Sequence, residues 1–195
     1  MFRTSFTVAA ALALLAAGTG AQSLTAGKTA TGTQIIEGKP MKILVAYYSR
    51  TGTTKQVCTE LAAQLGADLE QITDTKKRSG IFGYLGGGRD AMKKVPTTIG
   101  TLACDPSQYD LVVLASPVWA GHVAPALRTY LTQAKGKIKK TAFLCTMGGS
   151  GDAGTFADMR ELTGLEPAAR LTLLQREVKK GAHAAKLKEF ADKLK

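Results

Sequence analysis

The sequence predicts an α/β domain in which a doubly wound, five-stranded parallel sheet carries helices on both faces. Two apolar runs support this prediction most strongly. Residues 43–47 (ILVAY) and 109–115 (YDLVVLA) are rich in strand formers, and the second is apolar enough to be buried on both faces. A loop and then a helical pattern of apolar residues follow each run. Strands that alternate with helices in this way favour a parallel sheet.

The spacing of apolar residues places the remaining elements. A first helix is expected after residue 54, with Gly66 as its C-terminal cap, and another opens with Pro125 in its first turn. Thr155 and Asp158 have capping-box spacing and are expected to precede a short helix. The other strands are expected within residues 67–72, 141–146 and 168–178. A long connection, with a short helix before Pro96, is expected at residues 73–104. A final amphipathic helix is expected at residues 187–194.

Residues 1–22 are expected to be a secretory signal peptide. Arg3 is their only charge, residues 6–17 are apolar apart from Thr7, and small residues at 18–21 offer a cleavage site. The apolar run is too short to span a bilayer. Residues 23–40 are interpreted as a linker and 41–195 as one domain without a membrane span, exported to the periplasm. If translation starts at Met41, the protein is instead expected to be cytoplasmic.

The domain is basic but has no pattern typical of nucleic-acid binding. Of 26 Lys+Arg and 15 Asp+Glu, only Arg3, Lys28, Lys39 and Glu37 precede residue 41, which leaves a net charge of about +9 beyond it. The lysines are spread along the chain without interleaved aromatic residues, so we expect no nucleic-acid partner. The three cysteines, Cys58, Cys104 and Cys145, lack metal-ligand spacing. Cys58 and Cys145 are expected to be buried free thiols, although export would also permit a disulfide between Cys58 and Cys145 or with Cys104.

Three loops, each directly after an expected strand, contain the candidate functional residues. The first, residues 49–54 (SRTGTT), joins a strand to a helix, and such a turn offers backbone N–H groups and the positive end of the helix to an anion. Arg50 is its only charged residue, so a terminal phosphate would be held mainly by hydrogen bonds. The alternative is an ordinary strand-to-helix turn capped by threonine. The other two loops are residues 116–122 (SPVWAGH) and 146–151 (TMGGSG).

The pattern Ser49-x-Thr51-Gly52-x-Thr54 resembles the phosphate loop of the flavodoxin-like family. The resemblance covers residues 41–195 and implies a sheet of order 2-1-3-4-5 with non-covalently bound FMN at the crevice between its first and third strands. It implies three groups of contacts. The phosphate would be held by Ser49, Arg50, Thr51, Gly52, Thr53 and Thr54. The isoalloxazine ring would be lined by Pro117, Val118, Trp119, Ala120 and Gly121. The pyrimidine edge of the ring would be bordered by Thr146, Met147, Gly148, Gly149 and Gly151.

Several of these residues have alternative interpretations. Trp119 is either a core aromatic or a platform against one face of the flavin, and its loop position favours the second. His122 would hydrogen-bond the flavin or act as a proton donor, or it would instead cap the next helix. Gly149, Gly151 and Gly154 have the spacing of a dinucleotide-binding fingerprint, and so do Gly86, Gly88 and Ala91. Neither pattern follows the first strand, which is where a Rossmann domain places this turn.

The expected function is that of an FMN-binding redox protein, either a carrier or an NAD(P)H-dependent reductase of a quinone-like acceptor. The third loop has no aromatic residue, so one ring face is expected to be open unless Phe82 or Tyr84 covers it. Residues 111–151 contain no Asp or Glu, which predicts a higher midpoint potential than an acidic flavodoxin has. A module that has lost FMN and serves only for binding is the remaining alternative.

Overall fold

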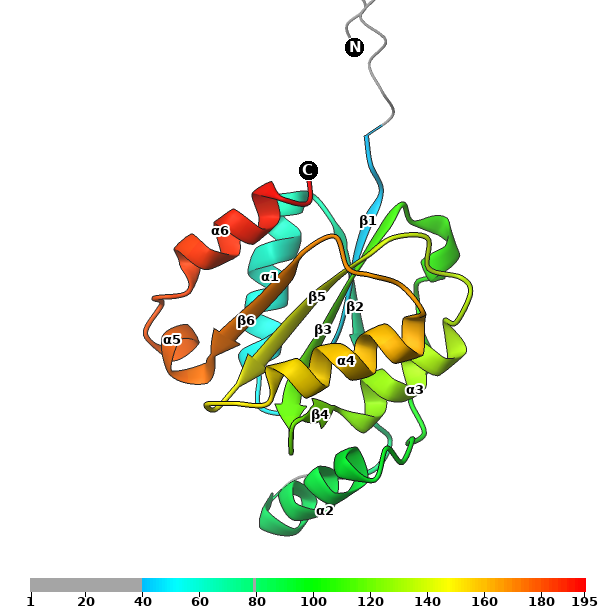
Figure 1. Ribbon diagram of the computed structural model, residues 1–195, viewed down its shortest axis with the longest axis vertical. Coiled ribbons are helices and arrows are strands. Elements are labelled where there is room, and N and C mark those ends of the chain that lie inside the picture. Colours follow the sequence, from blue (N-terminus) through cyan, green and yellow to red (C-terminus); the bar gives the residue numbers. More distant parts are fainter. Residues whose placement is uncertain (1–39, 79) are drawn as a thin grey trace, which may run out of the picture. The chain divides into compact units, whose positions relative to one another are not determined.

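The computed structural model of the protein describes residues 40–78 and 80–195. A five-stranded parallel sheet of order β2-β1-β3-β5-β6 forms its centre, and a short strand, β4, pairs antiparallel with β3 (Figure 1). Numbered along the parallel sheet, this is the predicted order 2-1-3-4-5. The strands are β1 (Ile43–Tyr48), β2 (Asp68–Ile72), β3 (Leu111–Trp119), β4 (His122–Val123), β5 (Thr141–Met147) and β6 (Arg170–Leu174).

Helices cover both faces of the sheet, as predicted. One face packs against α1 and α6 and the other against α3 and α4 (Figure 1). The helices are α1 (Thr53–Leu65), α2 (Gly80–Met92), α3 (Pro125–Gln133), α4 (Asp152–Thr163), α5 (Gln175–Lys179) and α6 (Ala184–Asp192), with one 3-10 turn at Pro106–Gln108. Residues 39–195 form a compact unit of their own.

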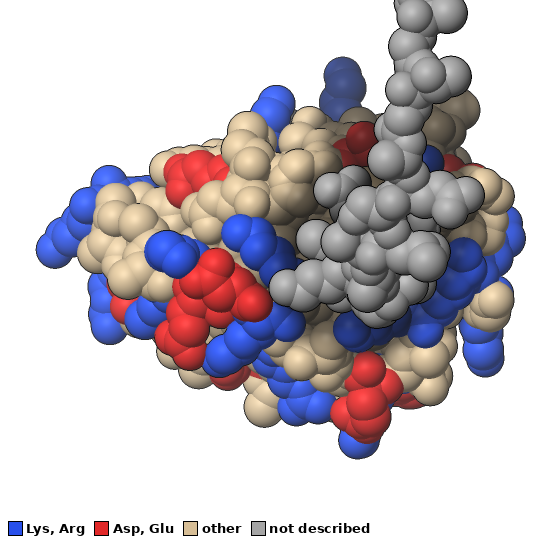
Figure 2. Space-filling model, turned by 90° about the horizontal axis from the view of Figure 1, so that it is seen from above, with Lys and Arg blue, Asp and Glu red and all other residues tan. Residues whose placement is uncertain are grey.

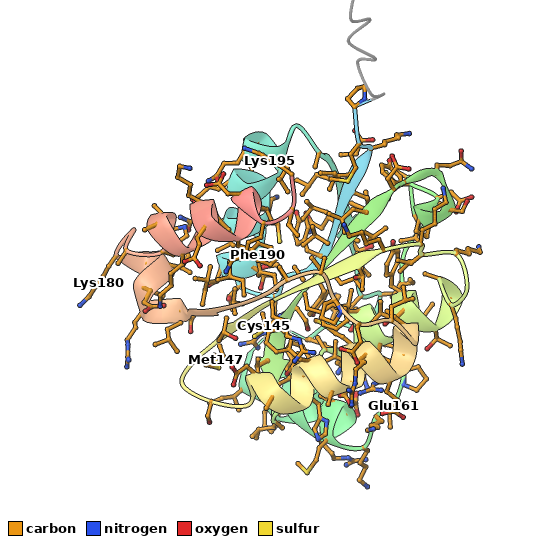
Figure 3. All side chains as sticks on the ribbon, turned by 45° about the horizontal axis from the view of Figure 1, so that its top comes forward. Cys145, Met147, Glu161, Lys180, Phe190 and Lys195 are labelled. Atoms are coloured by element: carbon orange, nitrogen blue, oxygen red, sulfur yellow. The ribbon has the colours of Figure 1, made fainter. Side chains whose placement is uncertain are left out.

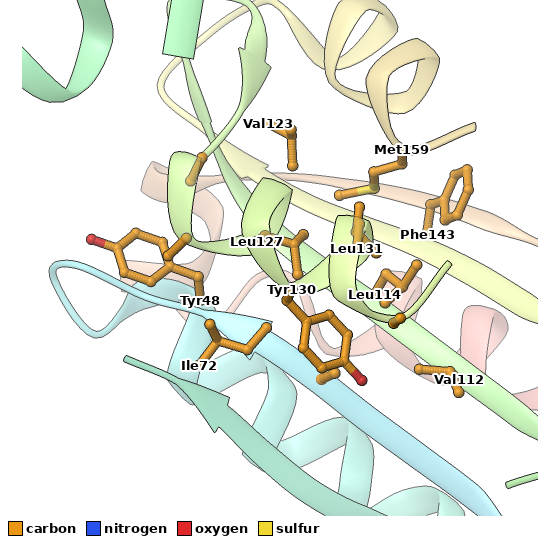
Figure 4. Close-up of a cluster of buried hydrophobic side chains, with 14 of the residues drawn as sticks. Tyr48, Ile72, Val112, Leu114, Val123, Leu127, Tyr130, Leu131, Phe143 and Met159 are labelled. Carbon is orange, nitrogen blue, oxygen red and sulfur yellow. The ribbon is translucent and has the colours of Figure 1, made fainter. Parts of the chain in front are cut away.

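The alternation of side chains along β1 divides the core into two halves. Leu44, Ala46 and Tyr48 face α3 and α4, in a cluster that includes Leu127 and Met159 (Figure 4). Ile43, Val45 and Tyr47 face the opposite side, where Phe190 of α6 is directed at the sheet (Figure 3). Because successive residues of a strand point to opposite faces, a strand buried on both sides must be apolar throughout. Residues 43–48 are all buried, which explains why the whole run is apolar or aromatic.

The third strand is longer than predicted, and this corrects the interpretation of residues 116–119 as loop. β3 continues through Trp119 and turns into β4 through a two-residue connection, Ala120-Gly121, with Trp119 opposite His122. Both turn residues have positive φ, 49° and 80°. Positive φ at both central positions is the type I′ hairpin geometry, which matches the twist of the flanking strands.

Several other element boundaries differ from the prediction, including that of the last helix, which covers Ala184–Asp192 rather than residues 187–194. α4 begins at Asp152, so Thr155 and Asp158 lie inside the helix rather than capping it, and the Thr155 hydroxyl donates to the Gly151 carbonyl. The fifth parallel strand covers only residues 170–174, and α5 starts directly after it. The long connection contains α2, a full helix of 13 residues.

The three cysteines are unbridged, and Cys58 and Cys145 are buried as predicted. Burial raises the pKa of both thiols, that of Cys145 to about 12, so neither is a reactive thiolate near neutral pH. Within residues 40–78 and 80–195, no helix has the length and apolar character needed to cross a bilayer. The predicted signal peptide and all but Pro40 of the predicted linker lie outside the described residues.

Candidate functional site

The three predicted loops meet at the carboxyl-terminal edge of the sheet and enclose a cavity of about 170 Å³. Parallel strands end at one edge of a sheet, so the loops that follow them become neighbours there. The cavity is lined by Arg50, Thr51, Thr53, Thr54, Pro117, Val118, Trp119, Thr146, Met147 and Gly148, all of which belong to the predicted set, and by Gln175. Ser49, Gly52, Ala120, Gly121, Gly149 and Gly151 lie in the same loops but do not line it.

The first loop leaves the start of α1 open to a ligand. Gly52 is the residue before the helix, in a left-handed conformation with φ 92°, and no described side chain caps the helix N-terminus. The Ser49 hydroxyl accepts a hydrogen bond of 3.2 Å from the Gly52 N–H. The first N–H groups of a helix have no partner within the helix, so they and the positive helix end remain available to an anion.

Hydrogen bonds join this loop to the ends of β5 and β6. The hydroxyls of Thr54 and Thr146 lie 2.9 Å apart in the interior, and the Gln175 side chain donates to the Thr53 hydroxyl over 3.4 Å. Gln175 was not among the predicted residues. Its position directly after the last strand is the signal that could have identified it, because that strand ends at the same edge.

Trp119 forms one wall of the cavity and is otherwise enclosed by protein. Only 9% of it is exposed. Its ring meets that of Tyr48 edge-on, with centroids 5.6 Å apart, and the Arg78 guanidinium lies 5.7 Å from its centroid. A β-carbon at Gly87 of α2 would come within 2.4 Å of the ring, so the helix backbone lies directly against it. Trp119 is therefore both a core aromatic and a lining residue.

Glycine packing locks the second loop against the third. A β-carbon at Gly151 would lie 2.8 Å from the Gly121 Cα, and one at Gly154 would lie 2.3 Å from the Gly121 carbonyl oxygen. The glycine spacing that resembled a dinucleotide fingerprint thus allows α4 to approach the β3–β4 hairpin closely. These glycines follow β5, the fourth parallel strand along the chain, whereas a dinucleotide fingerprint follows the first strand.

The Asp158 carboxylate holds the same hairpin from within α4. It accepts hydrogen bonds from the Arg128 guanidinium at 2.6 Å and the Val123 N–H at 3.2 Å, and its Oδ2 lies 3.0 Å from His122 Nδ1. Burial alone would raise the pKa of this carboxyl, but the charge of Arg128, the Val123 N–H and His122 together hold it below the ordinary value. His122 thus bonds to α4 rather than capping α3.

The electrostatics of the cavity suit a negatively charged ligand. Arg50 is its only charged lining residue, and no carboxylate among the described residues lines it. Arg50 donates to the Arg78 carbonyl over 3.2 Å, which ties its guanidinium to the segment between β2 and α2. Phe82 is 89% exposed on α2 and does not cover the cavity, whereas the side chain of Tyr84 lies outside the described part of the chain.

Comparisons with solved structures identify the architecture. A flavoprotein from Lactobacillus acidophilus in complex with FMN is 23% identical, with a TM-score of 0.61 over 73% of this chain and 99% of that one. The apo form of a flavoprotein from that organism gives a TM-score of 0.54 at 24% identity, over 73% and 98% of the two chains. The chain has the flavodoxin-like fold. A flavin-mononucleotide-bound flavodoxin from Fusobacterium nucleatum shares it at 11% identity, with a TM-score of 0.50 over 79% and 96% of the two chains.

Sequence comparisons alone do not detect this likeness: no protein-family profile matches the chain, and no curated protein does. In a flavodoxin-like fold the ligand crevice lies where the strand order reverses, beside the first and third strands. The cavity described above is at this position, since most of its lining comes from the loop after β1 and from the ends of β3 and β5.

Proposed function

We propose that the protein is a redox flavoprotein that binds FMN non-covalently at the carboxyl-terminal edge of the sheet. The observation that carries this proposal is the meeting of the three loops around a single cavity beside the open N-terminus of α1. Such a helix start suits a phosphate group, and a neutral to positive lining suits its double negative charge. The flavoproteins with the same fold add support.

The residues present fit the parts of FMN. Ser49, Thr51 and Thr53 would offer hydroxyls to the phosphate, and residues 53 and 54 their N–H groups. The Gly52 N–H stays on Ser49, and the Thr54 hydroxyl stays on Thr146. Pro117, Val118 and Trp119 would line the isoalloxazine ring. The cavity of about 170 Å³ is smaller than the roughly 300–1,000 Å³ typical of sites that enclose such ligands, so we expect part of the ring to stay accessible to a redox partner.

Bound FMN would supply the electron-transfer chemistry, and the chain would supply binding, orientation and electric field. The Asp158 contacts and the close-packed Gly121, Gly151 and Gly154 fix the hairpin that carries Trp119. Arg50 would add positive charge near the cofactor. His122 acts here as a positioning residue for the hairpin, because its Nδ1 is committed to Asp158.

A reductase is the second candidate function, and one observation favours it. A cavity of about 300 Å³ lies between α2 and the β3–β4 hairpin, lined among others by Leu85, Met92 and Trp119. It shares Val118 and Trp119 with the cofactor cavity. A small apolar acceptor of the quinone type, reduced at the expense of NAD(P)H, would fit there. A carrier would instead exchange electrons with a protein partner.

We further propose that the protein is exported to the periplasm, with a cytoplasmic form as the alternative if translation starts at Met41.

Comparing FMN with riboflavin tests the phosphate site directly, since riboflavin lacks only the phosphate. We expect the domain of residues 39–195 to bind FMN at least tenfold more tightly. Thr51→Glu places a negative charge in the loop and should abolish this preference without weakening riboflavin binding. Thr59→Glu makes the same change on the exposed side of α1 and serves as the matched control. Equal affinities for FMN and riboflavin in the unmodified domain would refute the proposal. Anaerobic addition of NADPH then separates a reductase, whose flavin bleaches, from a carrier that bleaches only with dithionite.

A further inference from the structure

Helix α2 carries a group of large apolar side chains exposed to solvent, of which Leu85 and Met92 also border the cavity beside Trp119. Phe82 is 89% exposed, Ile81 72%, Leu85 63% and Met92 60%, and Val95 just beyond the helix is 42% exposed. Among the described residues, the only other exposed large apolar side chains are Met41 and Leu69, and both are less exposed, at 36% and 39%. Contiguous exposed apolar groups usually mark an interaction site.

The packing of α2 explains why these side chains face outward. Among the α2 residues whose burial the structure describes, Gly87 and Ala91 are the buried ones, and Gly87 lies against the Trp119 ring. Gly83 approaches the backbone of Arg78 so closely that a β-carbon would lie 2.3 Å from its carbonyl carbon. The helix is therefore pinned to the domain along one narrow glycine-rich side. Ile81, Leu85 and Met92 share a stripe on the helix, since they are spaced by i, i+4 and i+11.

Basic residues surround this apolar group. Residues 75–95 contain six Lys or Arg and one acid, Asp90. Asp90 is already paired with Lys76 and Arg78. Lys77 precedes the helix, and Arg89 and Lys93 lie near its end, all exposed. At the opposite end of the domain, where the parallel strands begin, Lys/Arg and Asp/Glu are interspersed (Figure 2). We call residues 81, 82, 85, 92 and 95 with Lys76, Lys77, Arg89 and Lys93 the α2 surface.

We propose that the α2 surface docks the protein on a bilayer that contains anionic lipids. A helix with phenylalanine, leucine and isoleucine on one side and Lys or Arg around them lies in the interface of a membrane, where its apolar groups enter the acyl boundary and its cations meet lipid phosphates. Four apolar side chains of the helix are exposed by 60–89%. A deformable lipid surface accepts such projections without a preformed complementary shape.

A second copy of the chain is a poorer occupant of the α2 surface. In a symmetric dimer the same patch meets itself, so the basic residues around the two apolar groups would face one another. With a net charge of about +9 on residues 41–195, the two subunits would also repel each other. An acidic protein partner would satisfy the charges, but it would need a concave apolar site that matches the projecting Phe82 and Leu85. The proposal does not depend on FMN binding.

Co-sedimentation of the 39–195 domain with vesicles tests the proposal. We expect binding to an equal mixture of phosphatidylglycerol and phosphatidylcholine, at least tenfold weaker binding to phosphatidylcholine alone, and a decrease with added salt. Phe82→Ser/Leu85→Ser should reduce binding to the mixed vesicles at least tenfold. Met41→Ser/Leu69→Ser replaces the two exposed large apolar side chains that lie outside the α2 surface among the described residues, and it should not change binding. Circular dichroism checks that each variant is folded.

Charge variants make the test specific. Lys77→Glu/Lys93→Glu should weaken binding to the mixed vesicles, whereas Lys135→Glu/Lys139→Glu, an equal change of net charge at exposed positions outside the α2 surface, should weaken it much less. Equal losses in the two double variants would indicate attraction by net charge alone and overturn the proposal. So would absence of vesicle binding, dimerisation in solution that Phe82→Ser/Leu85→Ser abolishes, or selective binding of the α2 surface to an acidic protein.

Discussion

Thr54 and Thr146 share a buried hydrogen bond of 2.9 Å between their hydroxyls, which joins the start of α1 to the end of β5. The two residues are 1% and 4% exposed. They are 92 positions apart in the sequence, and no other side-chain hydrogen bond among the described residues links these two segments. This bond fixes the first loop against the third, and with it the shape of the cavity.

The first prediction concerns this pair. Thr54→Val should lower the free energy of unfolding by about 1–3 kcal/mol, because the Thr146 hydroxyl is left buried without a partner. Thr146→Val should have a similar effect for the reciprocal reason. The double variant should lose less than the sum of the two, since it removes both polar groups. Urea unfolding of all four proteins measures this cycle, and strictly additive losses would show that the hydroxyls do not interact.

A second prediction addresses the backbone of the first loop, residues 49–54. Gly52→Ala should destabilise the protein by about 1–2 kcal/mol, because the left-handed conformation is unfavourable for residues with a β-carbon. A methyl group there would meet no atom within 4 Å, so the cost lies in the backbone alone. Gly148→Ala is the matched control, since it also has open space but no positive φ. Thermal unfolding should separate the two, and equal melting temperatures would contradict the assignment of strain to Gly52.

The contact between α2 and Trp119 leads to a third prediction. Gly87→Ala should displace the indole ring, because the new methyl carbon would lie 2.4 Å from Trp119 Cζ3. We expect a shifted emission spectrum and a loss of about 1–3 kcal/mol in stability. Trp119 is the only tryptophan in the chain, so its fluorescence reports this site alone. Gly88→Ala lies one residue on, in open space, and should leave the spectrum unchanged; a shift in both variants would refute direct contact at Gly87.

The fourth prediction is a pH dependence that arises from Asp158. Its folded-state pKa is held below the ordinary value, so its ionised form stabilises the folded protein above about pH 4, and this contribution is lost as the pH falls further. Asp158→Asn removes the charge opposite the buried Arg128 and should cost about 3–5 kcal/mol at neutral pH. The stability difference between the natural protein and this variant should shrink below about pH 4. Glu166→Gln, at an exposed pair, should change little; a difference independent of pH would contradict the role of the Asp158 charge.

A fifth prediction concerns the potential of the bound flavin and rests on the proposed function. With Arg50 in the cavity wall and no carboxylate among the described lining residues, the reduced, negatively charged cofactor would be favoured. We therefore expect a higher midpoint potential than that of an acidic flavodoxin. Arg50→Gln should lower it by tens of millivolts, where about 59 mV equals a tenfold change for one electron. A redox titration measures both, and an equally low potential in the natural protein would contradict this prediction.

Much of the fold could be predicted because strand burial leaves a strong trace in the sequence. The apolar runs at 43–47 and 109–115 predicted β1 and β3, and the residues after these runs and after the strand expected at 141–146 predicted the three loops. The extension of β3 to Trp119 was missed because Ser116 and Pro117 are typical of loops. Pro117 is accommodated near the end of the strand, beyond the residues that pair with β1.

The remaining differences arise from tertiary contacts that have no local signature. The glycines of α2 disfavour a helix by propensity, yet Gly83 and Gly87 are what allow it to approach Arg78 and Trp119. Asp158 resembled a capping residue by spacing, whereas its partners Arg128 and Val123 come from a distant part of the chain. Gln175 has no motif of its own and is brought to the cavity only by the end of β6.

The central claim is that the three loops form an FMN site, and titration of the purified 39–195 domain with FMN tests it most directly. Trp119 lines the cavity, so bound FMN should quench its fluorescence to a plateau at one equivalent, while the flavin absorption spectrum changes in parallel. Saturable one-to-one quenching that Thr51→Glu weakens, and Thr59→Glu does not, is the predicted result. A domain that is purified without flavin and shows no saturable quenching on addition of FMN would contradict the claim.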